Sequence, residues 1–306
     1  DTTTCSLMAY GGDPYLLDAD PYSGAYQAVT DSVCRVVASG GSRRHCWLSL
    51  QEYFPKLGSD PKRWGKPVAA LLGAFSAQLD LEVAAIGGKD SMSGSFNDLD
   101  VPSTLISFAA SIGSTKTIMS PEFKKAGHQV VLLEAAVTRD GLPEPNSLRH
   151  VLDTLEQAIA DGVVSSVSFV ENGGMAIAVM KQCFGNGMGF AFTGPFSSVQ
   201  LFVRRPAAFL LELKRDYTGL GIPVGTVTND GVITCGGQHI TLRELAVPYE
   251  GALESIYPQK TQEQAAPLPV LRSKCACEAA PKIGIARPRV LIPVFPGTNC
   301  EYDSAR

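Results

Sequence analysis

The stretch Glu82-Val-Ala-Ala-Ile-Gly-Gly-Lys-Asp-Ser-Met-Ser-Gly94 decides how the first third of this sequence folds. Glu82 to Ile86 is short and apolar, which predicts a strand, and Gly87 to Gly94 predicts a loop directly after it. A helix precedes the strand, because from Pro67 onward apolar residues recur at helical spacing on a face that we expect to be buried. That face consists of Val68, Leu71, Leu72, Phe75 and Leu79. A further strand, Ser103 to Ile112, follows the loop.

The loop combines residue types that bind phosphate and metal. Gly87-Gly88 leaves room for backbone N–H groups to approach an anion, and Lys89 adds a positive charge. Asp90 is a carboxylate of the kind that binds magnesium, and the hydroxyls of Ser91 and Ser93 can donate to phosphate oxygens. The order of these residues is not that of a Walker A loop. A plain surface turn explains the same composition, so the residues alone leave both interpretations open.

Two polar residues upstream are candidates for the same site. Cys46 to Leu50 predicts a short strand, and Gln51 and Glu52 follow it. We expect both side chains to reach the strand-end edge that carries the loop. An exposed connection to the next helix is the alternative interpretation.

Two α/β units account for most of the chain. In the first, Val29, Val33, Val36 and Val37 recur at helical spacing, which predicts one buried helix face that ends at Gly40-Gly41. In the second, strands and helices alternate, which predicts a mixed sheet covered by helices and places the chain in the α/β (α+β) class. The second unit's expected strands are Gln129–Ala135, Val163–Val170, Gly189–Thr193, Val199–Val203 and Ile222–Thr228, with helices capped by Asn146, opened by Gly173-Gly174, and following Pro206.

Composition limits the class of protein. A length of 306 residues corresponds to about two domains, and 45% apolar with 18% charged residues is typical of a folded globular chain. A net charge of −4 argues against a nucleic-acid surface, and no apolar run is long enough to cross a membrane. No secretory signal is visible, and eight irregularly spaced cysteines indicate a reduced, cytoplasmic protein.

Other polar clusters have simpler explanations than metal or nucleotide binding. Cys275 and Cys277 lack further ligands at zinc spacing, and the four histidines form no helical pair. The acidic loop with Asp13, Asp18 and Asp20 is a metal candidate, although such acids are more often solvated. Gly173-Gly174 suits an anion at a helix N-terminus, with close helix packing as the alternative.

Three motifs together resemble the phosphoribosylformylglycinamidine synthase family, the formylglycinamide ribonucleotide amidotransferases of purine synthesis, in its single-chain form. They are Ala85–Gly94, the Asp13-Pro-Tyr15 stretch with its Gly24-Ala-x-x-Ala-Val29 helix, and Phe295-Pro-Gly-Thr-Asn-Cys-Glu-Tyr-Asp303. The resemblance runs over essentially the whole chain. It implies an aminoimidazole-ribonucleotide-synthetase-like second repeat, with an N-terminal-type subdomain at 1–115 and a C-terminal-type subdomain at 116–247. A linker at 248–288 and the first strand and turn of a glutaminase domain at 289–306 complete the expected organisation, so we expect a fragment of a longer enzyme.

In this family ATP phosphorylates the formamide oxygen, and ammonia from glutamine displaces the phosphate. The resemblance therefore implies ATP and Mg²⁺ as cofactors and Asp90 as a metal ligand, with Asp31 as a second metal candidate. Lys89 and Ser91 are the catalytic candidates. The residues carried over as nucleotide and phosphate contacts are Gly87, Gly88, Lys89, Ser91 and Ser93, joined by Gln51 and Glu52.

The chain departs from the family at its auxiliary nucleotide site. Arg35 stands where the family has an amide, and Phe169-Val-Glu-Asn-Gly-Gly174 replaces a segment with a metal-binding aspartate. The glutaminase nucleophile motif is absent, and Cys300 belongs to the opening turn of that domain rather than to its catalytic centre.

These matches and departures predict an ATP-dependent ligase as the parent protein and no turnover by this chain alone. The expected partners are a first synthetase repeat and a glutaminase domain, with a small-molecule substrate and neither nucleic acid nor membrane. Because superfamily members pair such subdomains sheet to sheet, a homodimer is a further expectation. The alternatives are a non-catalytic scaffold half with a degenerate nucleotide pocket, and another ATP-dependent synthetase of the superfamily.

Overall fold

The structure, a computed structural model, describes residues 3–194, 196–215, 217, 219–259, 284, 286–287, 289–296, 298 and 300–306. The chain forms two units, Asp1–Ile256 and Tyr257–Arg306. The first unit holds two large sheets and a two-stranded one, and it confirms the predicted α/β class with mixed sheets covered by helices. None of the helices among these residues is both long and apolar enough to cross a membrane.

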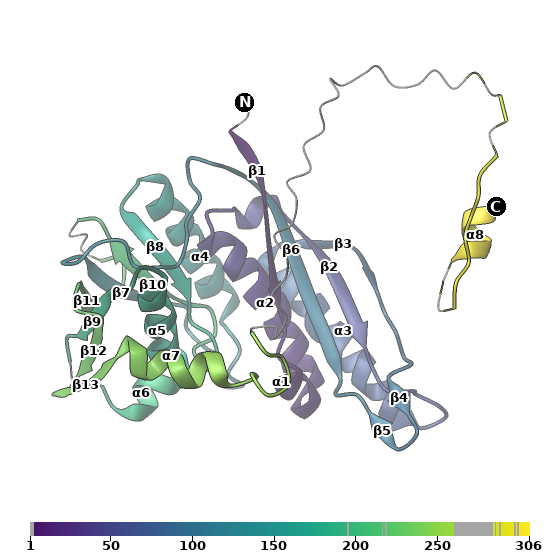
Figure 1. Cartoon of the computed structure of the whole chain (residues 1–306), viewed down its shortest axis with the longest axis horizontal. Helices are drawn as coiled ribbons and strands as arrows, with labels where there is room; N and C mark the ends of the chain where they lie inside the picture. The colour runs from purple at the N-terminus through teal and green to yellow at the C-terminus, as the bar shows by residue number, and fades with distance from the viewer. Residues whose placement is uncertain are drawn as a thin grey trace, which may run out of the picture. The chain divides into compact units, whose positions relative to one another are not determined.

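A four-stranded sheet forms the N-terminal half of the first unit. Its order is β1 (Thr4–Gly11), β6 (Thr104–Ser114), β2 (Cys46–Tyr53) and β3 (Ala84–Lys89), and only the β2–β3 pair is parallel. Strand β1 was not predicted, because its apolar and polar residues do not alternate clearly along the sequence. Helices α2 (Pro21–Ala38) and α3 (Pro61–Leu81) run beside the sheet (Figure 1).

The α2 helix forms the centre of the core as predicted. Val29, Val33, Val36 and Val37 are fully buried, and the helix ends at Ala38 with Ser39 as its C-cap, just before Gly40. Two predicted strands extend further than expected at their C-terminal ends. Strand β2 continues through Gln51 and Glu52 to Tyr53, and strand β3 continues through the glycine pair to Lys89.

The apolar face predicted for α3 is exposed rather than buried. Its five members are each at least half exposed, from 50% at Leu71 to 62% at Leu79. The buried face instead carries small residues, and a Cβ on Gly73 would lie 2.0 Å from the carbonyl oxygen of Tyr22. The small residues form the buried face because they let α3 approach α2 closely. The helix also begins at Pro61, capped by Asp60, so Pro67 lies inside it.

A seven-stranded sheet forms the C-terminal half of the unit, and all its pairs are antiparallel except β12–β9. Helix α4 (Pro145–Ala160) packs on the side facing α2 and α3, and α5 (Gly174–Asn186) packs on the other. The strand order is β13 (Gln238–Thr241), β12 (Val232–Cys235), β9 (Gly189–Phe192), β11 (Ile222–Thr228), β7 (Gln129–Glu134), β10 (Ala208–Leu213) and β8 (Val164–Phe169).

Three predictions for this half are wrong. The expected strand at Val199–Val203 is helix α6 (Ser198–Phe202), because Ser197 and Gln200 form a capping box. The expected helix after Pro206 is strand β10, whose fully buried residues pair with β7 and β8 on both sides. The N-cap of α4 is Glu144 rather than Asn146. Helix α7 (Leu242–Gly251) was not predicted.

Smaller elements complete the described residues. They are α1 (Pro14–Ala19), the 3-10 helix η1 (Arg43–His45), the two-residue strands β4 (Ser95–Phe96) and β5 (Leu99–Asp100), and, in the second unit, α8 (Glu301–Ala305). Residues 289–296 form no strand, contrary to prediction, and Leu291 is 89% exposed. An isolated strand has no neighbour to pair with, which explains this result. Cys275, Cys277 and most of the predicted linker lie outside the described residues.

Candidate functional site

The parallel pair β2–β3 brings together the residues that the sequence predicted for one site. Gln51 lies opposite Lys89 in the register, and the Gln51 Nε2 group donates to the Lys89 carbonyl oxygen at 3.0 Å. Gly88 lies opposite Leu50, where a Cβ would come within 2.2 Å of the Leu50 carbonyl oxygen. The glycine is therefore required for the close approach of the two strands.

Backbone hydrogen bonds then tie the residues after β3 to the end of β2. The Ser91 N–H donates to the Glu52 carbonyl at 3.1 Å, and the Phe54 N–H donates to the Ser91 carbonyl at 2.8 Å. The Gly94 N–H closes the loop by donating to the Phe54 carbonyl at 2.9 Å. The structure thus brings Gln51 and Glu52 together with the predicted loop. We call residues 51–52 and 87–93 the strand-end site.

Glu52 is the unusual residue of the strand-end site. Its side chain is only 3% exposed, and its Oε1 atom is buried with no hydrogen-bond partner. Burial, with a further contribution from the charge of Asp90, raises the pKa of Glu52 to about 7. A buried carboxyl oxygen without a donor is costly in a folded protein, which marks this position as one that a ligand could satisfy.

The remaining groups of the strand-end site are accessible. Lys89 and Asp90 are exposed, and the hydroxyl oxygens of Ser91 and Ser93 lie 2.8 Å apart. Within a short segment the site therefore presents one cation, two carboxylates and two hydroxyls. Carboxylate oxygens are hard ligands of the kind Mg²⁺ takes, so Glu52 and Asp90 fit the predicted metal. No group of three or more His, Cys, Asp or Glu side chains that could hold a metal ion occurs in the described part of the chain.

A second polar cluster lies between the two halves of the first unit, where the family's auxiliary nucleotide was expected. Asp31 accepts hydrogen bonds from Gln27 Nε2 at 2.5 Å and from an Arg204 guanidinium nitrogen at 3.4 Å. Burial raises the pKa of Asp31, and Arg204 and Gln27 oppose that shift. Both carboxylate oxygens of Asp31 are therefore already occupied. We call this set the intersubdomain cluster; it contains Asp13, Gln27, Asp31, Arg35, Glu171, Asn172 and Arg204.

Arg35 completes the cluster. Its guanidinium donates to Glu171 at 2.9 Å and to the Tyr10 carbonyl, and it lies 5.5 Å from the centroid of the Phe169 ring. The cavity that remains is about 60 Å³, far below the roughly 300 Å³ of typical small-molecule sites. The residues present do not fit a metal-bound nucleotide here, because cations already neutralise the acids and side chains fill the space.

The other predicted anion and metal candidates have structural roles. Asp13 and Asp20 cap helices α1 and α2, and Asp18 pairs with Lys66 at 2.9 Å. Gly173 and Gly174 have positive φ values. A Cβ on Gly174 would lie 2.5 Å from the Leu201 carbonyl, so the predicted alternative of close packing explains this pair.

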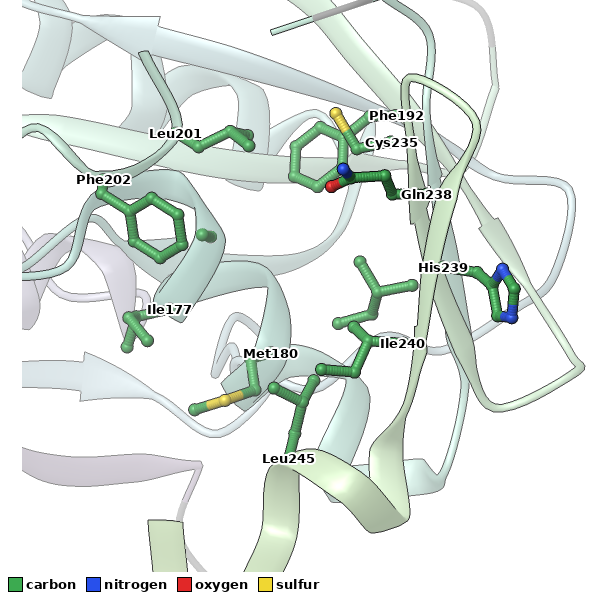
Figure 2. A pocket seen from close by; sticks show the side chains of 12 residues that line it. Ile177, Met180, Phe192, Leu201, Phe202, Cys235, Gln238, His239, Ile240 and Leu245 are labelled. Carbon is green, nitrogen blue, oxygen red and sulfur yellow. The ribbon is translucent and has the colours of Figure 1, made fainter. Parts of the chain in front are cut away.

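An apolar cavity of about 350 Å³ lies in the C-terminal half, between α5, α6 and the β12–β13 hairpin. Figure 2 shows Ile177, Phe202 and Leu245 around it, with the His239 ring turned away. The cavity brings no charged group to its centre. No Lys or Arg lines it, so it lacks the cationic side chains that typically bind phosphate.

Comparisons with known proteins agree with the motifs. No protein-family model matches the chain. The chain is 25% identical over 227 residues to the phosphoribosylformylglycinamidine synthase subunit PurL of Thermoplasma volcanium, and 21% identical over 232 residues to that of Lactobacillus delbrueckii subsp. bulgaricus. These matches cover 68% and 69% of this chain and 30% of each relative, so the chain spans about a third of the length of the curated relatives it matches.

Solved structures show the same fold. Thermotoga maritima PurL complexed with AMPPCP matches with a TM-score of 0.67 and 13% identity, over 90% of this chain and 49% of that one. Thiamine monophosphate kinase from Aquifex aeolicus matches with a TM-score of 0.51 and 14% identity, over 78% of this chain and 89% of that one. The relatives confirm, at low identity, the resemblance predicted from the motifs.

Proposed function

Given this resemblance, we propose that the chain is part of a cytoplasmic phosphoribosylformylglycinamidine synthase. Such a ligase converts formylglycinamide ribonucleotide, ATP and glutamine to formylglycinamidine ribonucleotide, ADP, phosphate and glutamate. The observation that carries the proposal is the sequence similarity to PurL subunits over 227 residues. The free thiols of the cysteines in the described residues agree with a reducing compartment.

The strand-end site supplies the residues that such a reaction needs. Lys89 would neutralise phosphate charge, and the Ser91 and Ser93 hydroxyls would donate to phosphoryl or substrate oxygens. Glu52 and Asp90 would hold Mg²⁺, and the ion, when bound, offsets the charge of the ATP phosphates. The ATP-analogue, ATP and ADP complexes of T. maritima PurL support nucleotide as the ligand class.

The outward face of the four-stranded sheet supports the proposed pairing with a first synthetase repeat. It exposes large apolar side chains, with Met8 83% exposed and Ile112 59% exposed. Tyr10, Trp47 and Phe108 border a groove of about 310 Å³ on the same face. A patch of this kind marks an interaction surface. In the absence of the partner repeat, this face would pair two copies of the chain.

We propose that the isolated chain turns over no substrate, because half of the site and the glutaminase nucleophile are supplied by other parts of the enzyme. A coupled assay with formylglycinamide ribonucleotide, ATP and ammonia should give no amidine product. Formation of that product by the purified chain would contradict the proposal.

A thermal shift experiment tests the substrate class. Formylglycinamide ribonucleotide at concentrations well above its Kd should raise the Tm, because a ligand that binds only the folded state stabilises it. The Lys89→Ala variant should lose that shift, whereas Lys62→Ala, which removes an exposed lysine outside the site, should keep it. Stabilisation by thiamine monophosphate instead would favour another member of the superfamily.

The alternative is a non-catalytic scaffold half, which the closed intersubdomain cluster favours. The cavity is about 60 Å³, and its acids are paired with arginines. These features are expected of a nucleotide pocket that no longer binds its ligand. The cluster and the strand-end site are separate groups of residues, so loss of one does not imply loss of the other. Binding of substrate that depends on Lys89 would exclude the scaffold interpretation.

A further inference from the structure

The apolar cavity of the C-terminal half has the form of a ligand pocket. Its volume of about 350 Å³ lies within the range of about 300–1,000 Å³ that is typical of small-molecule sites. We call it the α5 pocket; its walls include Ile177, Phe192, Leu201, Phe202, Ile240 and Leu245. None of its lining residues belongs to the strand-end site or to the intersubdomain cluster, so the function proposed above does not use it.

The α5 pocket is concave, with a buried floor and an exposed mouth. Met180 and Ile233 are only 5% and 9% exposed, whereas Phe202 and Ile240 are 54% and 39% exposed. A flat protein surface does not reach a floor of this kind, but a small molecule does. Since an apolar cavity of about 150 Å³ is enough for benzene, the α5 pocket has room for a molecule of about two rings.

Contacts outside the α5 pocket hold two of its walls in place. A Cβ on Gly174 would lie 2.5 Å from the Leu201 carbonyl oxygen, so this glycine lets α6 lie against the first turn of α5. The Phe192 ring packs edge-on against Phe190 and Phe196, with centroids 4.9 and 5.6 Å away. The walls therefore need no ligand to form them, and a ligand that enters does not have to order them first.

The charge of the ligand follows from the lining residues. They include no Asp, Glu, Lys or Arg, so an ion that entered would lose its hydration without gaining a partner of opposite charge. The hairpin instead brings the side chain of Gln238 to the pocket. Figure 2 shows its amide pointing toward Phe192, with the His239 ring pointing the other way. An amide both donates and accepts hydrogen bonds, so it suits an uncharged polar group.

We propose that the α5 pocket binds an uncharged small molecule of about two rings that carries one polar group. Its ring system packs against Phe192, because aromatic rings gain from stacked and edge-on contacts beyond the burial of their area. Its polar group forms a hydrogen bond with the Gln238 amide. Apolar burial supplies most of the affinity, and the amide fixes the orientation of the ligand.

Equilibrium dialysis of the purified chain with two matched probes tests the class of ligand. 2-Naphthamide is uncharged, and 2-naphthoate has nearly the same shape but carries a negative charge. We expect 2-naphthamide to bind with a Kd below about 1 mM, which is within reach of a ligand of this size. 2-Naphthoate should bind at least about tenfold more weakly, because its carboxylate finds no cation. Absence of 2-naphthamide binding, or equal binding of both probes, would overturn the proposal.

Three variants place the probe in the α5 pocket. Ala176→Phe fills the cavity and should weaken 2-naphthamide binding at least about tenfold. Gln238→Leu should weaken it by about two- to tenfold, the contribution of one hydrogen bond. Val247→Phe is the control, because Val247 is 71% exposed on α7 and does not line the pocket. Binding that is unchanged in Ala176→Phe would show that the probe lies elsewhere and would overturn the proposal.

The thiol of Cys235 provides a test that needs no variant. Cys235 lines the pocket and is partly exposed, whereas Cys300 is exposed in the second unit. Alkylation by iodoacetamide, followed for each cysteine by peptide mass spectrometry, measures how accessible each thiol is. 2-Naphthamide should slow alkylation of Cys235 in proportion to the fraction of chains that bind it, and it should leave Cys300 unaffected. Equal rates for Cys235 with and without saturating probe would contradict binding in the α5 pocket.

Discussion

The strand-end site and the intersubdomain cluster both contain a buried carboxyl group, and they satisfy it differently. Glu52 is 3% exposed and leaves Oε1 without a partner, whereas Asp31 is 8% exposed and has partners on both oxygens. In both, burial is the largest cause of the raised pKa. A carboxylate saturated by cation and amide is part of the structure, whereas an unsatisfied one is available to a ligand.

The two carboxyl groups therefore differ in what a cation would meet on arrival. At Asp31, Arg204 and Gln27 occupy the positions that a metal or nucleotide would need. At Glu52, the like charge of Asp90 destabilises the ionised form. Binding of a cation is therefore favourable beside Glu52, whereas beside Asp31 it would have to displace Arg204.

The largest expected effect is at the cluster. Arg204→Ala leaves Asp31 buried without its cation, and we expect this to lower the free energy of unfolding by about 2–3 kcal/mol. Chemical denaturation at neutral pH measures it. In the Asp31→Asn background the same substitution should cost clearly less, because no charge is left unpaired. An equal cost in both backgrounds would show that Arg204 acts through packing alone.

A smaller effect, of opposite sign, is expected at the strand-end site. A folded-state pKa of about 7 for Glu52, above its unfolded value, means that folding favours the protonated form. The contribution of protonated Glu52 to the free energy of unfolding should therefore be fully present below about pH 4.5 and be lost as pH rises through 7. Glu52→Gln, which carries no charge, should stabilise the chain by about 1–2 kcal/mol at pH 8 and by little at pH 5.

Thermal unfolding across this pH range checks the prediction for Glu52. The wild type and Glu52→Gln should have similar Tm values at pH 5 and diverge above pH 7. Asp98→Asn, which alters an exposed acid elsewhere, is the control and should follow the wild type. Parallel curves for Glu52→Gln and the wild type would mean that Glu52 is not the group that titrates.

The smallest stability effect is expected at Lys89. Its side chain is exposed, so Lys89→Ala should change the free energy of unfolding by less than about 0.5 kcal/mol. Denaturant titration of Lys89→Ala, Arg204→Ala and the wild type measures the free energy of unfolding of each and so compares the two effects. A loss above about 1 kcal/mol would show that Lys89 supports the fold, and a binding defect in the variant would then be uninformative.

The sequence allowed the prediction that Gln51 and Glu52 lie beside the loop, but not that Glu52 is buried. Lys89, expected in the loop, is the last residue of β3, because it pairs with Gln51 of β2 across the length of helix α3. Nothing in the local pattern indicates that Glu52 is buried, since its position inside β2 depends on a strand that extends to Tyr53. The pairing of Asp31 with Arg204 joins residues 173 positions apart, which periodicity cannot reveal.

Helix α3 shows a second limit of sequence patterns. Its large apolar residues have helical spacing, and the predicted face was correct in composition but wrong in burial. The inner face is decided by Gly73 and Ala74, whose small size allows close contact with α2. Hydrophobicity alone cannot rank two apolar faces of one helix, because fit against the neighbouring helix decides between them.

Calorimetric titration with Mg²⁺ and a non-hydrolysable ATP analogue tests the contrast between the two sites most directly. The account predicts that the wild-type chain binds, that Lys89→Ala weakens binding at least about tenfold, and that Asp31→Asn changes it less than about twofold. Binding that is lost in Asp31→Asn and kept in Lys89→Ala would contradict it, as would absence of binding by the wild-type chain.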